Sequence, residues 1–438
     1  MSAFIPALRA RLPWLGVALA MLAVLVGCTT ESGGYNTTSP PKMRFVNAAM
    51  DLGAVDISIG TIPTLTAVGF ETAVPYRNAP LGEQPVTLVS SGTTTTVIST
   101  PVNFDNGQRY THIVYGRPVA PHALVVADNV DLPGGGRYKL RFLNTATESG
   151  SLDIYVTTPG VALDAVGPTI ANVALDGASD YLELDVAPIE IRIAPSGTKT
   201  VLYDSGQIAL SERNAYSLVA YSRGDPAAVN AALLTNDTLG SGSLQNSVVG
   251  KVRLINAVPG IAAINLSVDG SAIVSNVAYG AATAYGVTAS GAHAVTIQPT
   301  ATPSVNIVTG SATFPAGGDA SVIVFGSAPT QVAITLADAN FLPMTAGNAR
   351  VRVVNAGTGM GSVNTYINGA LTVGALVGGA ASLYFELPAA SYDLTFIDAA
   401  SSGTVLDIPA LALAAGHTYT VVLIGTPTAP AYVLTQDR

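Results

Sequence analysis

The sequence predicts an all-β protein of four tandem immunoglobulin-like β-sandwich domains after a signal peptide and a flexible tether. The composition is the first observation: 44 Gly and 27 Pro interrupt short runs of Val, Ile, Leu, Thr and Tyr, which favours short strands over helices. The second observation is a strand pattern that recurs at domain-sized intervals. The third is strand density, because about seven strands in about 100 residues fit a sandwich, whereas a propeller blade is about half as long.

The recurrent pattern starts with Arg, two apolar residues and Asn. In every copy an Asp or Asn follows twelve positions after the Arg, without a gap. The copies start 141 − 44 = 97, 253 − 141 = 112 and 352 − 253 = 99 residues apart, which is typical of whole small domains and too long for a solenoid repeat. The residues of the pattern are Arg44, Asn47 and Asp56; Arg141, Asn144 and Asp153; Arg253, Asn256 and Asn265; and Arg352, Asn355 and Asn364.

Each unit contains a similar series of predicted strands. After the first strand comes an alternating one, such as residues 55–59, whose period of two predicts a half-buried antiparallel strand. Two closing strands end each unit, and in three units a Tyr stands at the entry of the penultimate strand. This position resembles a tyrosine corner, so we interpret the Tyr as structural, with ligand binding as the alternative. The three residues are Tyr110, Tyr216 and Tyr419, and Ala320 replaces the Tyr in the third unit.

The aligned patterns also set the expected boundaries. The predicted domains are 43–130, 137–237, 250–340 and 349–438. A signal peptide at 1–27 and a tether at 28–42 precede them. The Gly-containing joints 131–136 and 238–247 are expected to flex. The third joint, 341–348, is expected to pack between its neighbours, because it opens with Phe-Leu-Pro-Met.

The N-terminal residues predict export and lipid anchoring. Arg9 and Arg11 precede an apolar run at 12–26, which is interrupted by proline and is typical of a signal peptide. The sequence Leu-Val-Gly-Cys ending at Cys28 resembles the bacterial lipobox, which implies cleavage before Cys28 and acylation, for example with palmitate. Cys28 is the only cysteine, so no intramolecular disulfide can form. The residue after Cys28 is Thr29 and not Asp, which favours the outer membrane over retention at the inner membrane. The alternative to a lipobox is an ordinary signal peptide with an incidental cysteine.

Charge argues against nucleic-acid binding. The formal net charge is −9, only 11% of the residues are charged, and no cluster of Lys and Arg with interleaved aromatic residues occurs. An acidic surface repels phosphate backbones, so we expect no nucleic-acid partner. Acidity of this kind favours an exported protein that stays soluble at a surface.

We predict no enzyme, no cofactor and no metal. A catalytic cysteine is excluded once Cys28 is acylated, and the sequence contains no Gly-x-Ser-x-Gly nucleophile elbow. The histidines lie at different positions in different units, which argues against a shared base or zinc site. A cryptic hydrolase remains the less favoured alternative. The histidines are His112, His122, His293 and His417.

The recurrent polar residues are expected to be structural. The Asx position alternates between acid and amide, which general acid–base catalysis would not tolerate but hydrogen bonding would. We expect the recurrent Arg to pair with this Asx across the sheet or to cover apolar surface; ligand binding by the set is the alternative. Asp128, Asn129 and Asp131 suggest either a calcium site at a domain joint or an Asx-rich turn.

Several motifs together resemble one bacterial family. They are the Arg-apolar-apolar-Asn opening, the Ala-Tyr-Gly sequence at 278–280 and the Ala-Gly-x-x-Tyr-Thr-Val-Val ending at 415–422. These resemble the domain-of-unknown-function family 4397 over nearly all of 43–438, most closely in the third and fourth units. The resemblance implies exported, often lipid-anchored β-sandwich modules without an established activity. Many members carry His where this chain has the recurrent Asn, so any role peculiar to that His is absent here.

Together these observations predict a non-catalytic exported lipoprotein that acts as a cell-envelope spacer, scaffold or adhesive arm. Its expected partners are the outer membrane, through Cys28, and an envelope protein or glycan, on either the periplasmic or the external side. The alternative is a glycan- or peptidoglycan-binding protein in which exposed tyrosines such as Tyr155, Tyr285 and Tyr366 stack on sugars.

Overall fold

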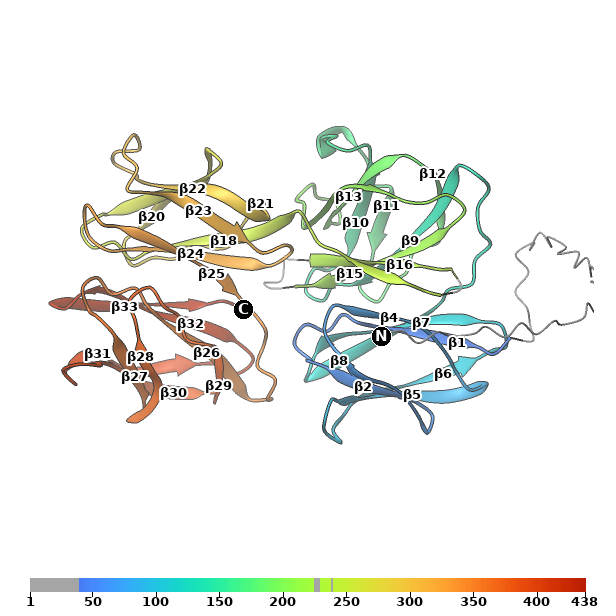
Figure 1. The fold of residues 1–438 in the computed structure, drawn as a ribbon, viewed down its shortest axis with the longest axis horizontal. Helices are drawn as coiled ribbons and strands as arrows, with labels where there is room; N and C mark the ends of the chain where they lie inside the picture. The colour runs from blue at the N-terminus through green and yellow to red at the C-terminus, as the bar shows by residue number, and fades with distance from the viewer. Residues whose placement is uncertain (1–38, 224–228, 238) are drawn as a thin grey trace, which may run out of the picture. The chain divides into compact units, whose positions relative to one another are not determined.

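The computed structural model describes residues 39–223, 229–237 and 239–438, which belong to one compact unit (Figure 1). The predicted signal peptide, Cys28 and most of the predicted tether lie outside the described residues. Within the described residues, no helix is long and apolar enough to cross a membrane.

The strands form four successive modules of eight strands each (Figure 1). Module 1 contains β1 (Lys42–Asn47), β2 (Val55–Ile59), β3 (Ile62–Val68), β4 (Thr72–Asn78), β5 (Gly82–Ser90), β6 (Thr96–Phe104), β7 (Arg109–Arg117) and β8 (Ala120–Ala127). Module 2 contains β9 (Arg137–Thr145), β10 (Leu152–Thr157), the 3-10 helix η1 (Leu163–Ala165), β11 (Ile170–Val173), β12 (Leu182–Asp185), β13 (Pro188–Pro195), β14 (Tyr203–Ala209), β15 (Ala215–Ser222) and β16 (Val229–Thr235).

The short strand β17 (Gly242–Gln245) follows in the joint after module 2. Module 3 contains β18 (Val249–Asn256), β19 (Ala263–Val268), β20 (Ser271–Ala278), β21 (Gly286–Ala289), β22 (Gly291–Pro299), β23 (Val308–Phe314), β24 (Asp319–Phe325) and β25 (Val332–Asp338). Module 4 contains β26 (Asn348–Asn355), β27 (Val363–Ile367), β28 (Ala370–Leu376), β29 (Phe385–Pro388), β30 (Ala390–Asp398), β31 (Thr404–Leu413), β32 (Thr418–Thr426) and β33 (Ala429–Gln436).

Every module is a sandwich of two sheets with the same topology. In module 1 the sheet orders are β4-β1-β7-β8 and β3-β2-β5-β6. The first and penultimate strands pair in parallel, as Arg44 opposite Thr111 shows, and the other pairs are antiparallel. The predicted all-β sandwich class is therefore confirmed. Each module has eight strands, whereas the sequence predicted about seven. The middle of each unit holds four strands, and some of them, such as β4 with its proline, carry a weak strand signal.

Each module has its own core between its two sheets. Phe45 and Phe104 are buried in module 1, Phe142 in module 2, Phe314 in module 3 and Phe396 in module 4. Because side chains alternate along a strand, the residues between these core positions point to the opposite face of the sheet.

That opposite face is also buried, against a neighbouring module. One apolar cluster joins Val46 and Ile113 of module 1 to Leu143 and Val219 of module 2. A second cluster joins modules 3 and 4 in the same way, through Ile255, Ile323, Val354 and Val422. We call these contacts the 1–2 interface and the 3–4 interface. They explain why every residue of β15 is buried, in place of a half-buried alternation.

The joint predicted at 238–247 contains a strand and is not simply a linker. Its strand β17 pairs antiparallel with β16, the last strand of module 2, and extends that sheet to five strands. The sequence did not predict this strand, which forms because an unpaired sheet edge offers backbone partners to an extended segment beside it.

Candidate functional site: the arginine networks between modules

The four recurrent arginines lie at the centres of the two interfaces. Each stands on the first strand of its module, faces away from its own core and is at most 5% exposed. Its Nε donates a hydrogen bond of 2.7–2.8 Å to a hydroxyl on the penultimate strand of the same module. The parallel register places this hydroxyl directly beside the arginine. The pairs are Arg44 with Thr111, Arg141 with Ser217, Arg253 with Ser321 and Arg352 with Thr420.

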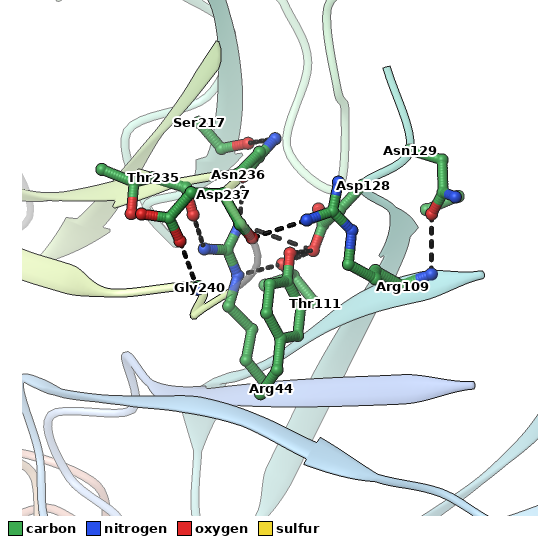
Figure 2. A network of polar contacts seen from close by, with 12 residues as sticks. Arg44, Arg109, Thr111, Asp128, Asn129, Ser217, Thr235, Asn236, Asp237 and Gly240 are labelled. Carbon is green, nitrogen blue, oxygen red and sulfur yellow. Dashed lines mark hydrogen bonds and ion pairs between the residues drawn. The ribbon is translucent and has the colours of Figure 1, made fainter. Parts of the chain in front are cut away.

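The remaining guanidinium nitrogens reach the partner module, and they do so reciprocally. Arg44 donates to the carbonyl of Thr235 at 2.6 Å and to Oδ1 of Asn236, both at the end of module 2 (Figure 2). Arg141 donates to the carbonyl of Ala127 at 2.8 Å and to Oδ1 of Asp128, at the end of module 1. Each module therefore binds the end of the other's last strand. The exchange resembles a two-fold interface built from two copies of one fold.

The 3–4 interface repeats this exchange with a carboxylate on each side. Arg253 of module 3 donates to Asp437 at 2.7 Å, and Arg352 of module 4 donates to Asp338. The two carboxylates also accept hydrogen bonds from Ser321, at 2.6 Å, and from Thr420. Charge-assisted bonds of this kind satisfy both ions where water is excluded.

A tyrosine covers each guanidinium group. The guanidinium carbons lie 4.8–4.9 Å from the ring centres, within the range of cation–π attraction. Three of the hydroxyls also donate to an interface carboxylate, at 2.6 Å for Tyr76 and Tyr285 and 3.1 Å for Tyr384. Burial raises the pKa of each of these three tyrosines, so each keeps its proton. The covering residues are Tyr76, Tyr181, Tyr285 and Tyr384.

The expected pairing of the recurrent Arg with the recurrent Asx is therefore wrong. The Arg instead pairs with the residue at the end of the partner's last strand, for which the sequence predicted no pairing with Arg. A usable signal existed, because Asp128, Asp338 and Asp437 hold equivalent positions. In module 2 the equivalent is Asn236, and not the neighbouring Asp237, since Asn236 donates its backbone N–H to the start of β15 as Asp128 does to the start of β7.

The recurrent Asx instead holds a bulge in the adjoining strand. Its Oδ1 accepts a backbone N–H, at 2.7–2.8 Å, from a residue with positive φ where the ladder shifts register. Only an acceptor oxygen is needed, so Asp and Asn serve equally. In module 1 this bond lowers the pKa of Asp56. The pairs are Asp56 with Ala67, Asp153 with Asn172, Asn265 with Asn276 and Asn364 with Ala375.

The recurrent Asn fixes the chain where the first strand ends. Asn47 donates to the carbonyls of Gly53 and Val68, both at 2.9 Å, and accepts the N–H of Ala49 at 3.1 Å. The other three make the same kind of bonds and all four are at most 1% exposed. These side chains tie the two sheets of each sandwich together and are not free for a ligand. The other three are Asn144, Asn256 and Asn355.

The tyrosines at the penultimate strand bond to the backbone five residues upstream. Tyr110 accepts the N–H of Asp105 at 3.2 Å, and Tyr216 accepts that of Ser211 at 3.0 Å. Tyr419 accepts the N–H of Ala414 at 3.2 Å. The hydroxyl thus spans the connection into the penultimate strand, which is the geometry of a tyrosine corner.

The structure does not bring the histidines into a catalytic arrangement. His293 lies 2.7 Å from Asp269, but its other nitrogen faces the carbonyl of Ser290 at 2.9 Å and not a hydroxyl. The bonds to Ser290 and Asp269 raise the pKa of His293. His112 is fully buried against Phe45, and burial lowers its pKa to about 4. None of these histidines is therefore poised between a carboxylate and a nucleophile.

Two further expectations about ligands are corrected. Asp128, considered for calcium, is fully buried and faces Arg44 and Arg141, whose charges exclude a cation there. Among the described residues no group of three or more His, Cys, Asp or Glu is arranged to hold a metal. Of the tyrosines considered for stacking on sugars, Tyr155 is buried within its module, and Tyr285 is half-buried with its hydroxyl bonded to Asp338. Tyr366 is also half-buried.

Comparison with known proteins gives the following matches. The model of the family described as Domain of unknown function (DUF4397) matches residues 41–155, 250–366 and 350–438. No curated protein matches the chain. Among solved structures, the Bacillus anthracis TIE protein is 11% identical, with 85% of this chain and 68% of that chain covered and a TM-score of 0.16. A product complex of a multi-modular glycogen-degrading pneumococcal virulence factor, SpuA, is 7% identical, with 83% and 37% covered and a TM-score of 0.16.

The family matches cover more than half of the chain. The matches include modules 1, 3 and 4 and the start of module 2, whereas residues 156–249 are not matched. By its repeated β-sandwich modules and these matches, the chain belongs to the family of the Domain of unknown function (DUF4397).

Proposed function

We propose that this protein is a non-catalytic, exported lipoprotein that is anchored in the outer membrane through Cys28 and acts as a structural scaffold of the cell envelope. The four modules would hold an envelope protein or glycan at a defined place relative to the membrane. The observation that carries the proposal is the use of the recurrent polar residues. The recurrent Arg, Asn and Asx of every module form hydrogen bonds that hold strands and modules together.

The structural role of these residues separates this proposal from its rivals. Selection for a binding or catalytic site would keep polar side chains converging on an open cleft. Here the repeated polar groups converge on buried interfaces instead. Glycan binding by Tyr155 or Tyr285 is not favoured, because Tyr155 is buried and the hydroxyl of the half-buried Tyr285 is bonded to Asp338.

The first experiment tests the lipid anchor at Cys28, the localisation of the protein and the accessibility of the modules to external protease. Cells producing the wild-type chain or the Cys28→Ala variant are labelled with a clickable palmitate analogue, fractionated and treated with external protease. We expect label and outer-membrane fractionation for the wild type only. Wild-type protein that remains unlabelled and soluble in the periplasm would refute anchoring.

A second experiment tests the absence of catalysis. The mature chain without its lipid is screened against esters, glycosides, peptides and phosphate esters. We expect no turnover above that of a buffer control. Hydrolysis that is lost on His293→Gln substitution would contradict the scaffold proposal.

A further inference from the structure

The 1–2 interface contains a partly enclosed cavity of about 240 Å³. It lies where the end of β1 and the start of β4 in module 1 face β15 and β16 of module 2, and β17 forms one of its walls. Val46, Ala73, Ala232 and Leu244 contribute apolar surface to it. Since an apolar cavity of about 150 Å³ holds benzene, which has six non-hydrogen atoms, this one has room for a molecule with about ten.

The cavity exists because module 2 carries a small side chain at this place. Ala232 lies four residues before Asn236, on the face of β16 that meets module 1. The other modules carry a larger apolar residue at the equivalent position, and each of these residues belongs to an interface cluster or packs against one. They are Leu124, Ile334 and Val433.

An equivalent place in the 3–4 interface shows how the larger residues close the space. Phe325 of module 3 holds the position of Tyr221 there. Ile334 holds the position of Ala232. A Cβ on the facing Gly379 of module 4 would lie 3.2 Å from the ring of Phe325 and 3.6 Å from a methyl group of Ile334. Such distances mean direct contact, so apolar side chains fill this place in the 3–4 interface.

A carboxylate stands beside the cavity where two other modules have glycine. Glu71 donates its backbone N–H to the carbonyl of the recurrent Asn, and its equivalents Asp176, Gly280 and Gly379 make the same bond. The φ of Glu71 is 62°, in the left-handed region that favours glycine. A glutamate held in this conformation points to a function of its side chain, because glycine would adopt it without strain.

Module 2 holds the Glu71 carboxylate in place. The hydroxyl of Tyr221 donates to Oε1 at 3.2 Å, and Nε of Arg223 lies 3.2 Å from the same oxygen. Nδ2 of Asn230 donates to it at 3.4 Å. Burial raises the pKa of Tyr221, so its hydroxyl keeps the proton that it donates. All three contacts with described residues are made by Oε1, which leaves Oε2 to accept a hydrogen bond from a ligand.

We propose that this cavity binds a small, mainly apolar alcohol. The apolar body would lie against Val46, Ala73 and Ala232, and the hydroxyl group would donate a hydrogen bond to Glu71. The site is built around residues that differ from their equivalents in the other modules. It therefore adds a ligand to the proposed scaffold and does not depend on the lipid anchor.

The charges at the cavity favour a neutral ligand. Arg223 already balances the charge of Glu71, and it would repel an ammonium group placed beside the pair. A carboxylate on the ligand would meet Glu71 with like charge. A hydroxyl group donates one hydrogen bond and brings no charge, so it fits the acceptor without either repulsion.

The test is a methyl NMR titration of the mature chain without its lipid, labelled at alanine and valine. The methyl signals of Val46, Ala73 and Ala232 report on the cavity. The probes are benzyl alcohol, cyclohexylmethanol and hexanol, each compared with its methyl ether, which has the same body but no hydroxyl donor. We expect saturable shifts with the alcohols. The ethers should bind about tenfold more weakly, because a hydrogen bond to a charged group is lost.

Two variants take their new residue from other modules. Ala232→Ile installs the residue of module 3, fills the cavity and should abolish binding of every probe. Glu71→Gly installs the residue of modules 3 and 4 and should weaken alcohol binding to the level of the ethers. Asp176→Gly makes a similar change at the equivalent position of module 2 and should leave binding unchanged. Circular dichroism and the urea midpoint check that each variant is folded.

Three results would overturn the proposal. One is the absence of saturable shifts with all three alcohols, which would mean that the cavity holds water only. Another is equal binding of alcohols and ethers by the wild-type chain, because Glu71 would then accept no hydrogen bond from the ligand. The third is undiminished alcohol binding by folded Ala232→Ile or Glu71→Gly, which would place the probes elsewhere on the molecule. If Ala232→Ile does not fold, the Glu71→Gly comparison decides.

Discussion

The 1–2 and 3–4 interfaces share one design but differ in charge. Between modules 3 and 4, two buried arginines face two buried carboxylates, Asp338 and Asp437. Between modules 1 and 2, Arg44 and Arg141 both contact Asp128, and Asn236 takes the place of the second carboxylate. Backbone carbonyls at Ala127 and Thr235 accept the remaining N–H groups there.

This difference shows which property the interface requires. Acceptor oxygens are present at equivalent places in both interfaces, whereas charge balance is present in only one. An amide and carbonyl groups can satisfy a guanidinium group's hydrogen bonds, but they do not offset its charge. The 1–2 interface should therefore be the more sensitive to loss of its single carboxylate.

The largest effect is expected from Asp128→Asn. The substitution leaves two buried arginines without an acid, so the free energy of unfolding of modules 1 and 2 should fall by about 3–5 kcal/mol. Urea unfolding followed by circular dichroism measures the loss, and amide hydrogen exchange assigns it to β1, β7, β9 and β15. A change below about 1 kcal/mol would show that acceptor geometry alone holds the interface.

Acidification should destabilise module 1 more than the other modules, because a histidine lies on the core side of its penultimate strand. His112 lies beside Thr111 on β7, and the equivalent residues in the other modules are Leu218, Val322 and Val421. Burial lowers its pKa from 6.5 to about 4, so the unfolded chain binds a proton that the folded chain does not. The free energy of unfolding should therefore be highest above pH 6.5 and fall as the pH decreases toward 4. The expected total loss is about 3 kcal/mol.

The matched control for this prediction is His112→Leu, which installs the residue of module 2. The variant should lose less stability than the wild type between pH 7 and pH 4. Identical pH profiles of the two chains, measured as urea midpoints, would show that His112 is not the source of acid sensitivity.

Asp437→Asn should convert the 3–4 interface into the charge pattern of the 1–2 interface. Asp338 remains close to both Arg253 and Arg352, so the expected loss is smaller, about 1–3 kcal/mol. Thermal unfolding by calorimetry gives the comparison with Asp128→Asn. Equal losses for the two substitutions would mean that Asp338 does not compensate for the loss of the Asp437 carboxylate.

The smallest expected effect is a gain in stability. Asn236→Asp places a second carboxylate beside Arg44, and should stabilise the 1–2 interface by about 1 kcal/mol. Asp237→Asn, one residue further along, serves as the control that leaves the interface unchanged. Destabilisation by Asn236→Asp would indicate that desolvation of the new acid outweighs its attraction to Arg44.

Much of the fold was open to prediction because its causes are local. Turn residues, period-two strands and the gap-free repeat of Arg44 through Asp56 indicated repeated sandwiches. The alternation of Asp and Asn at the Asx position indicated a hydrogen-bonding role, and the bulge at Ala67 explains it. The strand β17 was missed because Gly-Ser-Leu-Gln is too short and too polar to read as a strand.

The candidate site was harder to predict because its partners are distant. Arg44 and Asn236 lie 192 positions apart, and no spacing rule links them. One local signal was present: the first strand Lys-Met-Arg-Phe-Val-Asn has apolar residues on both faces, which is typical of a strand buried on both sides. That signal indicates burial but not the identity of the covering surface.

The sequence by itself determined the modules, since each strand's alternation and each turn's chemistry act within a few residues. It also determined which polar residues recur and therefore which positions matter in every module. Only the tertiary structure decided that the modules pack in pairs and that each arginine binds its partner's last strand. The physical reason is that a buried charge is stable only where distant acceptors converge on it, and that convergence exists only once whole sheets have packed face to face.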